Sequence, residues 1–148
     1  MFAVLIVSVL LTANEQTAQR QEPPARPFPF MQEMEQELRE LRTQINDPTQ
    51  NKSSLDLVKR MEQNSVGARN AVPPMIAKLP SAQQTPKIAA YKALMSILIA
   101  QEQDLAKALR AGQNTKAVGI LQGIVRTRQE GHDRFRPSRL GQPANRGR

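Results

Sequence analysis

The single histidine of this 148-residue chain, His132, is the only imidazole available to bind a metal ion. The chain has no cysteine, which excludes disulfides, zinc-thiolate sites, iron–sulfur clusters, thiol nucleophiles and haem attached through a C-x-x-C-H motif. Haem iron can be held between an imidazole and a thioether, and the chain contains six methionines. The chemistry open to His132 therefore depends on which methionine faces it.

Four segments between residues 30 and 136 have apolar residues at intervals of three and four, the period of an amphipathic helix. The first begins at Phe30, and Asn46-Asp47-Pro48 ends it. The second begins with Ser53 or Ser54 as its N-cap, and Pro73-Pro74 ends it. None of the segments has the alternation of a convincing strand, so an all-α fold is expected.

Residues 75–84 contain Pro80 and are expected to form a loop. The third helix then begins with Thr85 as N-cap and Pro86 as its first residue, and it ends at Gly112. Its apolar face is interrupted once, by Glu102. We expect this carboxylate to lie at the edge of the face and to reach water, because charged side chains are rarely buried.

The fourth helix begins near Asn114 or Thr115, and Pro137 ends it. The first and third connections are short, which favours antiparallel neighbours and an up-down-up-down four-helix bundle. In that topology the first helix starts at the end of the bundle where the fourth helix finishes. Met31 and His132 lie on the inward faces of those two ends, so the two side chains are expected to face each other.

A thioether opposite an imidazole is a reasonable axial pair for haem iron. The apolar lining of such a pocket would come from Met34, Leu38, Met61, Tyr91, Met95 and Leu98. Cations for the haem propionates would come from Arg126, Arg128, Arg134 and Arg136. The pattern alone leaves two other interpretations open, because methionine commonly fills cores and a histidine near a helix C-terminus commonly complements the dipole.

The strongest motif is Thr127-Arg128, three residues, His132, two residues, then Phe135-Arg136. With Met31-Gln-Glu-Met34, Pro73-Pro74 and Thr85-Pro86 in register, the chain resembles the soluble cytochrome b562 family over about residues 30–136. The resemblance implies a periplasmic b-type cytochrome that binds haem b non-covalently and transfers electrons. It also implies that Met31 and His132 are the iron ligands, that Met34 packs, and that no position is left open for enzymatic turnover.

Two positions depart from the family pattern. Met95 stands where an aromatic residue is common, and Gly131 stands where a tyrosine often precedes the histidine. These changes imply a looser pocket. They motivate an alternative of another class, a haem-free exported bundle that acts as an adaptor or stress-related binding protein.

The two ends of the chain differ from its middle. Residues 1–18 hold a ten-residue apolar run, too short to cross a bilayer, and small residues follow it, as in a signal peptide. Residues 19–29 are expected to be a proline-rich linker, and residues 137–148 are expected to be a basic, disordered tail. The expected mature protein is a periplasmic monomer without a membrane span, and it serves a redox partner protein. Nucleic acid is not an expected partner, because the arginines have almost no aromatic residues between them.

Overall fold

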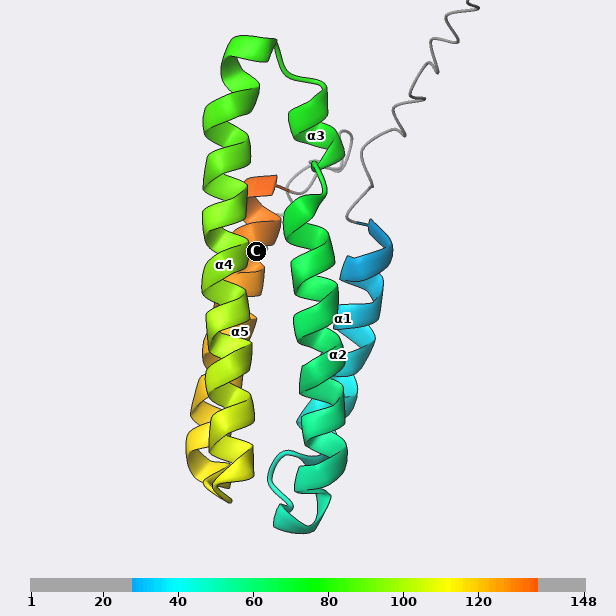
Figure 1. Cartoon of the computed structure of the whole chain (residues 1–148), viewed down its shortest axis with the longest axis vertical. Coiled ribbons are helices and arrows are strands. Elements are labelled where there is room, and N and C mark those ends of the chain that lie inside the picture. The colour runs from blue at the N-terminus through cyan, green and yellow to red at the C-terminus, as the bar shows by residue number, and fades with distance from the viewer. Residues whose placement is uncertain (1–27, 136–148) are drawn as a thin grey trace, which may run out of the picture.

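The computed structural model describes residues 28–135, and Figure 1 shows them as a bundle of helices. The long helices are α1 (Phe28–Gln44), α2 (Asn51–Asn70), α4 (Ser81–Arg110) and α5 (Asn114–Phe135). A 3₁₀ turn, η1 (Pro48–Gln50), and a short helix, α3 (Pro74–Ala77), lie in the connections. Residues 28–135 contain no strand, and the expected all-α, antiparallel four-helix bundle is confirmed.

The helices pack in the order α1 on α2, α2 on α4 and α4 on α5. The backbones of α1 and α5 approach each other closely at far fewer positions than those of the other neighbouring helices. In Figure 1 the start of α1 and the end of α5 lie at the same end of the bundle, and α3 with the first turns of α4 extends beyond them. The least tightly closed side of the bundle is therefore the one between its first and last helices.

The expected N-cap of the second helix is wrong by three or four residues, since the observed N-cap is Gln50. Neither serine is an N-cap, because α2 begins at Asn51. Ser53 lies within the first turn and donates from Oγ to the carbonyl of Gln50 at 3.0 Å. Ser54 is fully buried and accepts a hydrogen bond from Nε2 of Gln44 at 3.1 Å. The proline of η1 starts the turn early, so both hydroxyls fall inside the helix.

The expected loop over residues 75–84 is also wrong. Pro74 starts α3, and α4 begins at Ser81 with Pro80 as its N-cap, five residues before the expected N-cap at Thr85. Pro86 therefore lies inside α4, where it removes a hydrogen bond to the carbonyl of Ala82. Because Ala82 is exposed, water can satisfy that carbonyl, so a proline this close to the helix end is tolerated.

The expected end of the third helix and the expected start of the fourth agree with the structure. α4 ends before Gly112, which has φ of +68°, a left-handed conformation that favours glycine. The amide of Gln113 donates back to the carbonyl of Ala108 at 2.9 Å and so closes the last turn. Asn114 then ties this end together, since its Nδ2 donates to the carbonyl of Ile45 and to Oδ1 of Asn51, both at 2.8 Å.

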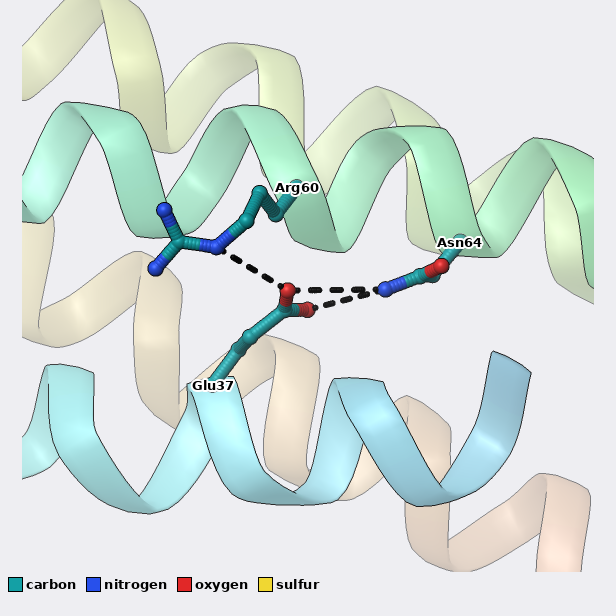
Figure 2. Close-up of polar contacts among 3 residues, drawn as sticks. All are labelled: Glu37, Arg60 and Asn64. Atoms are coloured by element: carbon teal, nitrogen blue, oxygen red, sulfur yellow. Dashed lines mark hydrogen bonds and ion pairs between the residues drawn. The ribbon is translucent and has the colours of Figure 1, made fainter. Parts of the chain in front are cut away.

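The interior between the helices is apolar, with fully buried side chains that include Leu41, Leu57, Met61, Leu105, Leu109 and Ile124. One buried acid, Glu37, links α1 to α2, as Figure 2 shows. Its carboxylate accepts from Nδ2 of Asn64 at 3.3 and 3.4 Å and pairs with Nε of Arg60 at 3.4 Å. Desolvation raises the pKa of Glu37, and these two partners partly offset that rise.

The expected signal peptide (1–18), the basic tail (137–148) and the linker up to residue 27 lie outside the described residues. Phe28 and Pro29, assigned to the linker from sequence, begin α1.

Candidate functional site

A cavity of about 500 Å³ lies between the four long helices, toward the end where α1 begins and α5 finishes. This volume is within the range of small-molecule and cofactor pockets. Every long helix contributes to the lining, together with the proline pair that follows α2. The lining residues are Met31, Met34, Glu35, Leu38, Met61, Pro73, Pro74, Tyr91, Leu94, Met95, Leu98, Glu102, Ile124, Thr127, Arg128, Gly131, His132 and Phe135.

Of the ten site residues predicted from sequence, the structure brings nine into this cavity. They are Met31, Met34, Leu38, Met61, Tyr91, Met95, Leu98, Arg128 and His132. The tenth, Arg136, lies outside the described residues. The helical intervals explain the convergence, because residues three and four apart share a face and each of these faces is directed inward.

Met31 lies in the first turn of α1 and His132 in the last turn of α5. Both side chains line the cavity, and both are partly exposed rather than fully buried. His132 takes part in interactions with its surroundings. The cavity thus combines one imidazole with the thioethers of four methionines, a donor set that suits iron better than a hard cation.

The arginines are distributed differently from the sequence expectation. Only Arg128 lines the cavity, and it forms an ion pair with Glu35 that joins α5 to α1. Arg134 pairs with Glu130 on its own helix at 2.8 Å, and Arg126 lines a second, shallower hollow near Arg42. The expectation that Arg126 lies at the open end of this cavity is therefore wrong.

Arg128 and Glu35 are about 30% exposed, with side-chain fractions of 29% and 32%. These two side chains form the polar rim of the cavity. A carboxylate that entered beside Arg128 would have to compete with Glu35 for the guanidinium. The positive charge of Arg128 is therefore available to a ligand only when its ion pair with Glu35 opens.

Glu102 contradicts the sequence expectation of a solvated carboxylate. The residue is fully buried and lines the cavity, and its Oε1 is hydrogen-bonded to the hydroxyl of Ser65 at 2.8 Å, while Oε2 has no hydrogen-bond partner. Desolvation raises its pKa from the ordinary 4.5 to about 8, and repulsion from Glu62 and Glu37 adds to the rise. The side chain is therefore a neutral carboxylic acid at pH 7.

Ser65 also contacts the site residue Met34, whose Sδ lies 3.0 Å from the same hydroxyl. Sequence reasoning missed both Ser65 and Glu102 as site residues. Each falls at the helical interval of its own buried face, and that interval was the available signal. For Glu102 the interval predicted only a position at the edge of that face.

Two aromatic residues close one side of the cavity. The rings of Tyr91 on α4 and Phe135 on α5 meet edge to face, with centroids 5.5 Å apart. The Tyr91 hydroxyl donates to the carbonyl of Ala68 at 2.7 Å, and burial raises the pKa of this phenol to about 12. Tyr91 is therefore held as a neutral hydrogen-bond donor that links α4 to α2.

Gly131 also lines the cavity, and a Cβ at this position would lie 3.1 Å from Cδ2 of Leu94. The glycine thus lets α5 approach α4 closely, one residue before His132. A larger side chain at this position would extend into the cavity and reduce its volume.

The residues present fit a haem group. The cavity has sufficient volume, mostly apolar walls, an imidazole, thioethers and an arginine at its rim. Within residues 28–135, no group of three or more histidine, cysteine, aspartate or glutamate side chains is placed to hold a metal ion. In the same part of the chain, no helix is both long and apolar enough to cross a membrane.

Comparison with protein families matches residues 30–136 to the family model described as cytochrome b562. No curated protein and no solved structure matches the chain. The match spans all four long helices except the first two residues of α1, and it includes every described residue that lines the cavity.

Proposed function

Because the chain belongs to the cytochrome b562 family, we propose that it binds haem b non-covalently in the cavity between its long helices and carries electrons. The observation that carries the proposal is that the chain's only imidazole and the first-turn methionine of α1 line the same cavity. Members of this family are electron carriers rather than enzymes, so the proposal includes no catalytic turnover.

His132 and Met31 are the proposed iron ligands. Met31 lies where α1 starts and His132 lies where α5 finishes, and these two helix ends are at the same end of the bundle. Both side chains line the cavity. Non-covalent binding is supported by the absence of cysteine from the whole sequence. A bound haem would supply the one-electron chemistry, while the protein would supply the ligands, an apolar environment and the polar rim.

The proposed location is the periplasm, and the proposed partner is a redox protein that exchanges electrons with a monomer of this chain. The support is the apolar run at residues 2–11 with small residues after it, which is typical of an export signal. Mass spectrometry of the protein from the periplasmic fraction of a bacterial host would test this, since the proposal expects a chain shortened near residue 13 or 18.

The direct test of haem binding is a visible spectrum of the purified protein with haemin, oxidised and reduced. We expect sharp bands of six-coordinate, low-spin iron in the wild type and their loss in His132→Ala. Gln129→Ala changes an exposed residue of the same helix and is the matched control. A wild-type protein that ignores haemin, or a His132→Ala variant with an unaltered spectrum, would refute the proposal.

One feature favours a second candidate function, a haem-free exported bundle that acts as an adaptor or stress-related binding protein. Arg128 at the rim already has a carboxylate partner, Glu35. Under this candidate the ion pair between Arg128 and Glu35 stays intact and no ligand replaces it. Haemin then leaves the thermal unfolding of the protein unchanged.

A further inference from the structure

We propose that Glu102 and Ser65 form a buried polar brace that holds the thioether of Met34 and so leaves Met31 as the α1 methionine able to act opposite His132. This inference deepens the proposed function and rests on it. In it, Glu102 and Ser65 are positioning residues, because they act through Met34 and are not proposed to touch the iron.

The brace joins three helices through a single hydroxyl group. Oγ of Ser65 on α2 lies 2.8 Å from Oε1 of Glu102 on α4 and 3.0 Å from Sδ of Met34 on α1. Ser65 and Glu102 are fully buried, and Met34 is 8% exposed. Met34 and Glu102 both line the cavity, so the brace forms part of its wall.

The protons of the brace can be assigned from its chemistry. A serine hydroxyl has one hydrogen to donate, and a thioether can only accept. A neutral carboxylic acid has its own hydrogen, so Glu102 can donate to Oγ of Ser65. The serine hydrogen is then directed at Sδ of Met34. Burial keeps Glu102 in this neutral form, whereas a carboxylate would draw the serine hydrogen away from the sulfur.

Met31 and Met34 compete for the same role because they are three residues apart on one face of α1. For Met34 to bind iron, its sulfur would have to leave the Ser65 hydroxyl and turn within a buried environment. That movement would break a hydrogen bond between buried groups, which is unfavourable. Met31 is only partly buried and lies one turn closer to the start of α1.

The test compares haem-loaded variants in which Met31 is removed. Met31→Ala should convert the low-spin spectrum to that of high-spin, five-coordinate iron, because Met34 is held. The double variant Met31→Ala/Ser65→Ala releases Met34 and should regain a low-spin spectrum. Met31→Ala/Ser54→Ala is the matched control, since Ser54 is a fully buried serine of the same helix that bonds to Gln44 instead.

Two spectroscopic outcomes would overturn the brace. One is a Met31→Ala variant that already retains methionine coordination, since Met34 would then never have been held. The other is a Met31→Ala/Ser65→Ala variant that stays as high-spin as Met31→Ala. Glu102→Ala in the Met31→Ala background removes the group that orients the Ser65 hydroxyl toward the sulfur and should also release Met34.

A readout on the haem-free protein separates this inference from the proposed function. With ¹³C-methyl-labelled methionine, the Met34 methyl signal should move in Ser65→Ala and remain in place in Ser54→Ala. An unmoved signal in Ser65→Ala would overturn the brace even if haem binds. A wild-type protein that takes up no haemin would overturn the proposed function, while the methyl signal would still decide whether the brace exists.

Discussion

At the scale of single residues, Glu102 is an acid that is fully buried in the wall of an apolar cavity. Desolvation destabilises the charged form of a carboxyl group, and Oε2 of Glu102 has no hydrogen-bond partner to compensate. Such a group stays neutral as long as the protein is folded and the pH is below its raised pKa. Its protonation is therefore coupled to folding.

This coupling predicts that the haem-free protein loses stability as the pH rises. Below pH 4.5 Glu102 is protonated in both the folded and unfolded states, so its contribution is fully present. Between pH 4.5 and about 8 only the folded state keeps the proton, so the free energy of unfolding falls, by at most about 1.4 kcal/mol per pH unit. Above about 8 the contribution is lost.

Urea unfolding of wild type and Glu102→Gln at several pH values measures this effect. The variant should lose less stability between pH 4.5 and 8, because the ionisable group is gone. Glu40→Gln, at an exposed position of α1, is the control and should follow the wild type. Parallel curves for wild type and Glu102→Gln would show that Glu102 is not buried as described.

The rim predicts opposite effects of its two charges on haemin binding. Glu35→Gln should free Arg128 for an incoming carboxylate and raise haemin affinity a few-fold, in line with the roughly 1 kcal/mol of a partly exposed ion pair. Arg128→Gln should lower the affinity. Fluorescence titrations at low and high salt measure both changes, which should shrink as salt screens the charges.

Glu130→Gln serves as the control for this prediction, because it breaks an exposed pair on α5 that does not line the cavity. Equal haemin affinities for wild type, Glu35→Gln and Arg128→Gln would show that the rim takes no part in binding.

At the scale of the helices, α1 meets α2 closely at one glycine. A Cβ at Gly67 would lie 2.6 Å from Cε1 of Phe30, too close for the ring to stay in place. Phe30 lies in the first turn of α1, the turn that also holds Met31. The glycine of α2 therefore helps to set the position of the helix end that supplies the candidate ligand.

Two glycine substitutions test this contact. Gly119→Ala, in an open position within α5, should stabilise the protein by about 0.5–1 kcal/mol through helix propensity. Gly67→Ala gains the same propensity but must displace Phe30, so we expect it to be less stable than Gly119→Ala by about 1–3 kcal/mol. Urea denaturation measures the difference, and equal stabilisation of the two variants would contradict the close approach.

At the scale of the whole molecule, the two ends of the bundle differ. The end that holds Gly112 is closed by Asn114 and Asn51, whereas the cavity lies toward the opposite end. An apolar cavity leaves its lining side chains without partner atoms on one side, which lowers stability relative to a filled core. A ligand that fills the cavity should therefore stabilise the entire fold.

Haemin should raise the melting temperature of the wild type. A ligand that binds only the folded state at 100 times its dissociation constant stabilises it by about 2.7 kcal/mol. Protoporphyrin IX without iron should give a smaller rise, because it can fill the cavity but cannot be ligated by His132. Differential scanning calorimetry measures both, and a melting temperature that haemin does not change would favour the haem-free candidate.

The fold was largely predictable from local sequence because helical periodicity and helix-ending residues act within a few positions of each other. The apolar intervals, the stop at Gly112 and the short connections were sufficient for the antiparallel bundle. The starts of α2 and α4 were not predicted, since the prolines that begin η1 and precede α4 initiate helical turns earlier than the serine and threonine caps suggested.

For the site, the sequence by itself determined the inventory of donors and the face of its helix on which each side chain lies. This was enough to predict that nine residues converge, because a face depends only on intervals along one helix. The tertiary structure alone decided that Glu102 is buried, that Ser65 connects it to Met34, and that Arg128 pairs with Glu35. Depth and partners depend on what the neighbouring helices place opposite a side chain, and the spacing within one helix carries no information about its neighbours.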